Sequence, residues 1–160
     1  MPAQTTAAAP APVTGGAVLA ELLERGYTLS VETRVDVHDH KIGPHPVTYA
    51  DQLVTAGPER VPDHLREAIV ADKPLFLAAA CVLDPPTPWL RELVRRCRTG
   101  AVYVSDCRTA PVGAGGALEY RITPGVLAAN IAAFVGLDPI DDAPRIEKVI
   151  RSALRSPTAR

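Results

Sequence analysis

The clearest alternation of apolar and polar residues in the chain runs from Tyr27 to His40. The apolar positions are Tyr27, Leu29, Val31, Val35 and Val37, and the polar positions between them include Ser30, Glu32, Arg34 and Asp36. A period of two residues is typical of a strand with one buried face. The pattern therefore predicts a strand over residues 27–40, followed by a loop rich in Pro and Gly.

Five segments instead space their apolar residues three and four positions apart, which is typical of amphipathic helices. Gly26 and Gly100 are suited to closing two of these helices, Thr87 to capping one, and Pro88 to its first turn. The predicted helices cover residues 17–26, 61–72, 87–100, 123–136 and 142–155.

A continuous apolar run, PLFLAAACVLD over residues 74–84, fits either a strand buried on both faces or a buried helix. The helix over 87–100 and the short apolar segment AVYVSD, residues 101–106, follow it. Strand, helix and strand in this order favour a βαβ unit with parallel pairing and a right-handed crossover. With a more exposed strand over 117–123, the sequence predicts a small α/β domain, a mixed sheet flanked by helices, with α+β as the alternative.

Length and composition narrow the class of protein. A chain of 160 residues with 47% hydrophobic and 22% charged residues fits one globular domain, which we place at residues 16–156 after a flexible Ala-, Pro- and Thr-rich tail at 1–15. The net charge of -1 and the 4% of aromatic residues argue against nucleic-acid binding. No apolar run is long enough to span a membrane and the first residues lack a basic leader, so we expect no membrane partner and a cytoplasmic location.

In the predicted βαβ unit, ligands would bind beyond the carboxyl ends of the strands. Asp84 and Asp106 end the two strands, and Arg108 follows in a glycine-rich loop. These three residues are candidates for binding a small anionic molecule, because Arg108 could hold a carboxylate or phosphate in bidentate fashion. The plainer interpretation is that both aspartates only stop strands and begin loops.

Three of the four histidines lie in RVDVHDHKIGPHP, residues 34–46. Continued alternation puts His38 and His40 on the face of Asp36 and Arg34, where a histidine could act as a general base with Asp36 fixing its tautomer and Arg34 anchoring an acidic substrate. An HxH pair can also chelate zinc or iron, with His45 or Asp36 as a third ligand. Since no third ligand is fixed by the sequence, we predict no metal and no cofactor, and keep the metal-dependent enzyme as an alternative.

The three cysteines have no metal-ligand or disulfide spacing. Cys81 and Cys97 fall at apolar positions and are expected to be buried, whereas Cys107, beside Arg108, is a candidate for a reactive thiol.

Two classes of function remain. The first is a small enzyme without cofactor, of isomerase, lyase or cyclase type, that uses His38, His40 and Asp36 on a small anionic metabolite. The second is a non-catalytic subunit or binding module that docks through the arginines of RELVRRCR, residues 91–98, and through the flexible tail. Self-association into a homo-oligomer fits either class. The enzyme requires His38 or His40 to face a cavity that contains an arginine, and the module requires a flat or convex surface there.

Overall fold

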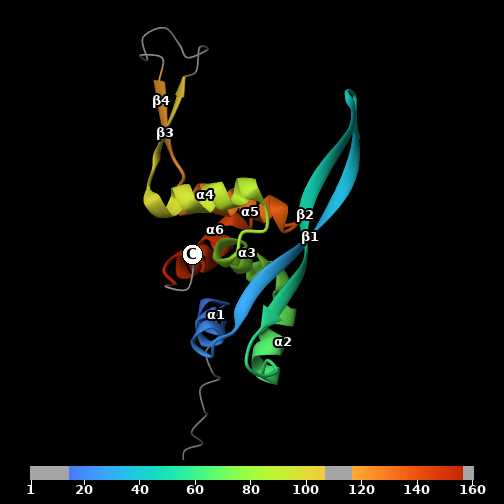
Figure 1. The fold of residues 1–160 in the computed structure, drawn as a ribbon, viewed down its shortest axis with the longest axis vertical. Coiled ribbons are helices and arrows are strands. Elements are labelled where there is room, and N and C mark those ends of the chain that lie inside the picture. Colours follow the sequence, from blue (N-terminus) through green and yellow to red (C-terminus); the bar gives the residue numbers. More distant parts are fainter. Residues whose placement is uncertain (1–14, 107–116, 157–160) are drawn as a thin grey trace, which may run out of the picture.

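The computed structural model describes residues 15–106 and 117–156. Within these ranges, helices form the body of the molecule and two separate antiparallel hairpins extend from it (Figure 1). The elements are α1 (Gly15–Glu24), β1 (Thr28–His40), β2 (Gly43–Ala56), α2 (Asp63–Ala71), α3 (Lys73–Leu83), α4 (Pro88–Thr99), β3 (Val102–Asp106), β4 (Ala117–Arg121), α5 (Pro124–Phe134) and α6 (Ala143–Leu154).

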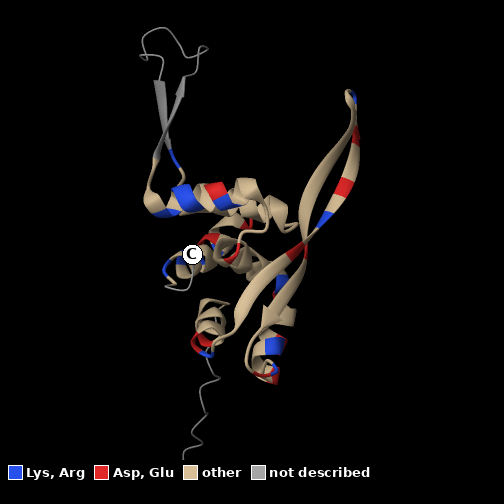
Figure 2. Ribbon diagram, in the orientation of Figure 1, with Lys and Arg blue, Asp and Glu red and all other residues tan. Residues whose placement is uncertain are grey.

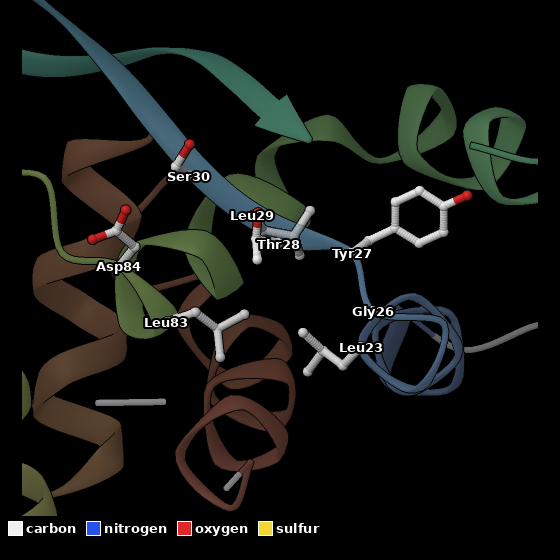
Figure 3. A pocket seen from close by; sticks show the side chains of 8 residues that line it. All are labelled: Leu23, Gly26, Tyr27, Thr28, Leu29, Ser30, Leu83 and Asp84. Carbon is white, nitrogen blue, oxygen red and sulfur yellow. The ribbon is translucent and has the colours of Figure 1, made fainter. Parts of the chain in front are cut away.

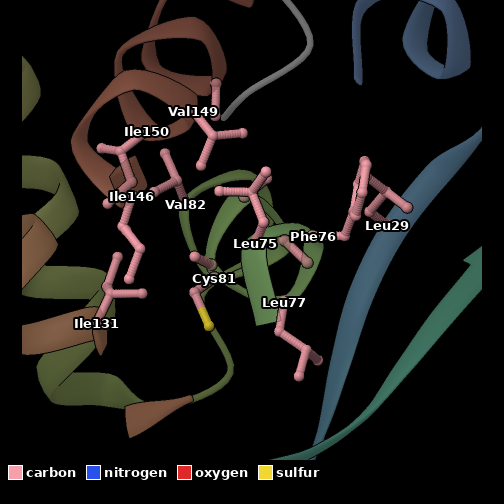
Figure 4. Packing of buried hydrophobic residues seen from close by; sticks show 14 of the residues in the cluster. Leu29, Leu75, Phe76, Leu77, Cys81, Val82, Ile131, Ile146, Val149 and Ile150 are labelled. Carbon is pink, nitrogen blue, oxygen red and sulfur yellow. The ribbon is translucent and has the colours of Figure 1, made fainter. Parts of the chain in front are cut away.

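Helix α3 is the centre of the core. Its residues from Leu75 to Val82 are all buried, so this helix is apolar on every side. A helix of that kind must be covered all round, and Figure 4 shows α6 and the ribbon of β1 and β2 on different sides of it. Side chains from α1, α5 and α6, among them Leu22, Ile131 and Ile150, complete a single hydrophobic cluster.

The helical state of residues 73–83 makes the predicted βαβ unit wrong. Ala78, Ala79 and Ala80 have the strongest intrinsic preference for helix, and Pro74 is in the first turn, where a missing N–H costs nothing. Because α3 is no strand, β3 has no parallel neighbour in the described part of the chain and pairs antiparallel with β4 instead. The domain does combine helices and strands, and its form is that of the α+β alternative.

The predicted strand over 27–40 is confirmed as β1, but its partner was not foreseen. Residues 43–56, which we expected to be a loop, form β2, and the two strands pair from Thr28 with Ala56 to His40 with Gly43. Only the near half of this ribbon packs on the helices: Leu29 is 2% exposed, whereas Val35 is 60% and Val37 66% exposed. The far half lies near the helices only at Val47, Thr48 and Tyr49, beside α5, and its outer end stands clear of the body (Figure 1).

One irregularity interrupts the ribbon. Glu32 pairs with Gln52 but Thr33 pairs with Ala50, so Asp51 of β2 has no opposite residue and forms a β-bulge. Ala50 and Leu53, on either side of the bulge, both pack against the core.

The five amphipathic helices are confirmed as α1, α2, α4, α5 and α6, within two residues of the predicted ends. The predicted closing glycines have left-handed backbones, with φ of 84° at Gly26 and 63° at Gly100. The predicted tail is outside the described residues up to position 14, and Gly15 already belongs to α1. The division into a tail and one domain over 16–156 stays a prediction.

The Thr87 cap gives a first testable prediction. Its Oγ1 accepts a hydrogen bond of 3.3 Å from the Leu90 N–H, and the residue is 8% exposed. We expect Thr87→Ala to lower the free energy of unfolding by about 1 kcal/mol, because the amide loses its acceptor in a place that water reaches poorly. Urea unfolding followed by circular dichroism measures the change, and Thr87→Ser, which keeps the acceptor, should lose less than half as much.

Candidate functional site

The predicted residues of β1 come together on one face of the far ribbon. Because β1 stays regular to His40, Arg34, Asp36, His38 and His40 project to the same side. Charges of both signs lie along this part of the ribbon (Figure 2). The grouping that the alternation predicted is therefore confirmed.

β2 adds three side chains to this face, of which Val47 is opposite Asp36. Tyr49 is opposite Arg34, and His45 is opposite His38. The Tyr49 hydroxyl shares a hydrogen bond of 3.1 Å with Nε2 of His38, and the Arg34 guanidinium carbon is 5.7 Å from the centre of the Tyr49 ring. Arg34 also donates to Asp36 at 3.3 Å and to Asp51 at 3.5 Å. The face thus carries a Tyr–His pair beside a guanidinium held by two carboxylates.

His38 and His40 are both exposed to solvent on this face. The rings of His40 and His45 meet edge to face with 6.0 Å between their centres. Among the residues described here, no group of three or more His, Cys, Asp and Glu side chains is arranged to hold a metal ion. A solvent-exposed ribbon fits the flat surface that a binding module requires better than the cavity that the enzyme requires.

The second predicted site does not assemble as expected, because its parallel strands do not exist. Asp84 follows the end of α3, where its N–H donates to the Ala80 carbonyl at 2.8 Å. Asp106 is the last residue of β3 and pairs with Ala117, and Arg108 lies outside the described residues, as does Cys107.

Asp84 borders a hollow of about 340 Å³ at the base of the first hairpin (Figure 3). The other residues that line it are Leu23, Gly26, Tyr27, Thr28, Leu29, Ser30 and Leu83. None of these side chains is basic, and the Asp84 carboxylate would repel an anion. The predicted role of Asp84 in binding an anionic ligand therefore gains no support from its surroundings.

A groove of about 490 Å³ lies between β2, α4 and α5. Its lining residues are Val47, Thr48, Tyr49, Trp89, Ala129, Asn130, Ala133 and Phe134. Trp89 is 45% exposed although it is the largest apolar side chain, and its ring meets the buried ring of Phe134 edge to face at 5.7 Å. Tyr49 belongs both to this groove and to the polar face of the ribbon, so the two features adjoin.

The arginines of α4, which the sequence offered as a docking surface, are largely engaged within their own helix. Glu92 accepts hydrogen bonds from Arg95 at 2.7 and 2.9 Å and from Arg96 at 2.7 Å. These bonds hold the pKa of the Glu92 carboxyl at about 2, below its ordinary value of 4.5. Arg95 and Arg96 are thus held by one shared carboxylate, which balances one of their two positive charges.

The groove residues and Tyr49 were missed by the sequence analysis. Trp89 is at an apolar position of the helix predicted over 87–100, but it is 45% exposed, whereas its neighbour Leu90 is completely buried. Tyr49 was overlooked because β2 was expected to be a loop. The available signal was the alternation of Val47, Tyr49 and then, after the bulge, Leu53 in a segment that follows a short turn.

Comparisons with protein-family models, with curated proteins and with solved structures find no match to this chain. In the described ranges, no helix has both the length and the apolar character needed to cross a membrane.

Proposed function

We propose that this protein is a non-catalytic binding module whose groove between β2, α4 and α5 holds one large apolar side chain of a partner protein. The observation that carries the proposal is the 45% exposure of Trp89 inside a groove backed by Phe134. Partly exposed Trp and Tyr side chains around an apolar hollow are typical of the residues that contribute most to protein interfaces.

The margins of the groove favour a peptide over a purely apolar ligand. The Asn130 side-chain nitrogen donates to the Val126 carbonyl at 2.9 Å, which leaves the amide oxygen as an acceptor for a partner's N–H. On the other side, Tyr49 contributes a hydroxyl. The apolar centre of the groove can contact an apolar side chain of a peptide, while Asn130 and Tyr49 on its two sides can bond to the backbone amides next to that side chain.

Trp89 is the only tryptophan in the chain, so its fluorescence reports on the groove alone. We expect capped leucine and phenylalanine peptides to shift its emission to shorter wavelength in a saturable way, and a capped triglycine to leave it unchanged, because only the large side chains displace water from the indole. Titration of the full chain with each peptide measures the shift.

Two matched variants test the groove. Ala133→Glu puts a charge into the groove. Val126→Glu puts a charge on the same helix, at a 43% exposed position that does not line the groove. Ala133→Glu should abolish the shift and Val126→Glu should preserve it. Equal shifts in both variants, or no shift with any peptide, would contradict the proposed function.

A second candidate is the enzyme without cofactor that the histidines suggested, acting on a small anionic molecule. The hydrogen bond between Tyr49 and His38, with Arg34 over the tyrosine ring, supports it, since these groups could move a proton and hold a carboxylate. If this enzyme is the function, a carboxylate or phosphate should raise the melting temperature of the protein, and His38→Ala and Tyr49→Phe should remove this effect. His64→Ala, at an exposed histidine on α2, should keep it. If no anion in such a screen stabilises the protein, the enzyme loses its support.

A further inference from the structure

The far half of the first hairpin exposes an apolar face that continues the buried face of its near half. Thr33, Val35 and Val37 follow Leu29 and Val31 on the same side of β1. Val35 and Val37 are 60% and 66% exposed, and Ile42 in the turn is fully exposed. Adjacent exposed valines on a protruding ribbon indicate a surface that is covered in the working form of the protein.

The ribbon also has one unprotected edge. Strands at a sheet edge are usually protected by prolines, bulges or short length. β2 has Pro44, Pro46 and the bulge at Asp51, whereas β1 runs regularly from Thr28 to His40 without a proline. β2 also lies beside α4 and α5 at the groove, and no other strand pairs with β1 in the described part of the chain. The free edge of β1 is therefore the one that can accept a further strand.

The sequence of β1 is complementary to itself when two copies run antiparallel about Val35. In that register Arg34 of each copy is opposite Asp36 of the other, and Glu32 is opposite His38. Val35 then meets Val35, and Thr33 meets Val37, so the apolar faces of the two ribbons also join. Four cross-strand pairs of favourable charge result when the histidine is protonated.

Neighbouring registers lack this complementarity. Centred on Arg34, the pairing would set Arg34 against itself and Glu32 against Asp36. Centred on Asp36, it would set Asp36 against itself and Arg34 against His38. A register centred between two residues would bring the valine side of one copy next to the charged side of the other.

The geometry points to a second copy of this chain as the partner of β1: we infer that two molecules pair their β1 strands antiparallel about Val35 and join their ribbons into a four-stranded sheet. The contact is isologous, so it closes on itself and forms a dimer instead of a fibre. Figure 1 shows that the outer end of the ribbon extends beyond the helices. The dimer does not use the groove at Trp89, so the inference of a dimer does not depend on the proposed function.

Charge reversals at Arg34 and Asp36 test both the partner and the register. The full-length protein should sediment as a concentration-dependent dimer. Arg34→Glu puts a carboxylate opposite Asp36 twice, and Asp36→Arg puts a guanidinium opposite Arg34 twice, so each variant alone should have its dimer dissociation constant raised about tenfold or more. Both side chains are about half exposed, and circular dichroism should show unchanged folding.

A mixture of the two variants gives the decisive result. In the mixed dimer, the carboxylate introduced by Arg34→Glu is opposite the guanidinium introduced by Asp36→Arg. The native Asp36 of the first chain is opposite the native Arg34 of the second. Both pairs are therefore attractive again. Mixing should restore dimers to near the level of the original protein. Arg60→Glu changes an exposed charge beyond the end of β2, outside the residues that pair in the dimer, and should dimerise normally. A monomeric original protein, a dimer that neither reversal weakens, or a mixture that stays monomeric would each overturn the inference.

Discussion

Phe76→Ala is expected to lower the free energy of unfolding by about 3–5 kcal/mol, the range for removing a large aromatic side chain from a close-packed core. Phe76 is 1% exposed and is the largest of the fully buried side chains. It lies on the side of α3 that faces β1 (Figure 4), so its loss would leave a cavity between the central helix and the ribbon. Chemical unfolding of both proteins under the same conditions measures the difference.

A suitable control is Val70→Ala on α2, where the side chain is 76% exposed. It removes apolar atoms that already contact water and should change the free energy of unfolding by less than about 0.5 kcal/mol. If Phe76→Ala were equally mild, residues 73–83 would not be the buried central helix.

Alkylation of Cys81 in the folded protein is expected to be slower than that of an ordinary thiol by at least a thousandfold. Burial raises the pKa of the Cys81 thiol from 9.0 to about 12, which alone lowers the reactive thiolate fraction at pH 8 by about a thousandfold. The residue is also fully enclosed in the core, so the reagent cannot reach the sulfur. Iodoacetamide labelling followed by peptide mass spectrometry gives the rate for each cysteine separately.

Cys97 is the internal comparison. It is only partly buried on α4, and although burial raises its pKa, the positive charges of Arg151 and Arg98 act in the opposite direction. It should therefore be alkylated well before Cys81, and denaturation should make the two rates nearly equal. Rapid labelling of Cys81 without denaturant would mean that α3 opens locally.

The elements that could be predicted from the sequence are those whose stabilisation is local. The cap at Thr87 and the left-handed glycines at positions 26 and 100 follow from residue chemistry within one turn, and the structure has them where expected. The error at residues 73–83 has a different origin. A segment buried on every side carries no periodicity, so only its alanines favoured helix, and they were outweighed by the apparent βαβ order.

The same distinction applies to the candidate site: features that depend on one segment could be predicted, and features that depend on pairing or packing could not. The shared face of Arg34, Asp36, His38 and His40 depends on the alternation of one strand and could be predicted. The hydrogen bond between His38 and Tyr49 depends on pairing with β2. The two prolines and the bulge of β2 hide the alternation that would identify it as a strand. The groove at Trp89 depends on how α4, α5 and β2 pack, and no pattern within one segment contains that information.

The bulge at Asp51 reverses the face of the ribbon on which the odd-numbered residues of β2 lie. Between the bulge and the base of the ribbon, Leu53 and Thr55 share the side of Leu29. Between the bulge and the turn, Ala50 and Thr48 are on that side, and the odd-numbered Val47 and Tyr49 are on the other. One unpaired residue thus lets a strand be apolar toward the helices at its base and place a tyrosine beside His38 further out. Without Asp51, Gln52 would still be opposite Glu32 and Ala50 opposite Thr33, so the two faces of the ribbon and the turn at Lys41 and Ile42 would be kept and only the local distortion of the strand would be lost. The bulge is therefore a place where β2 could lose one residue without a change in the pairing of the ribbon.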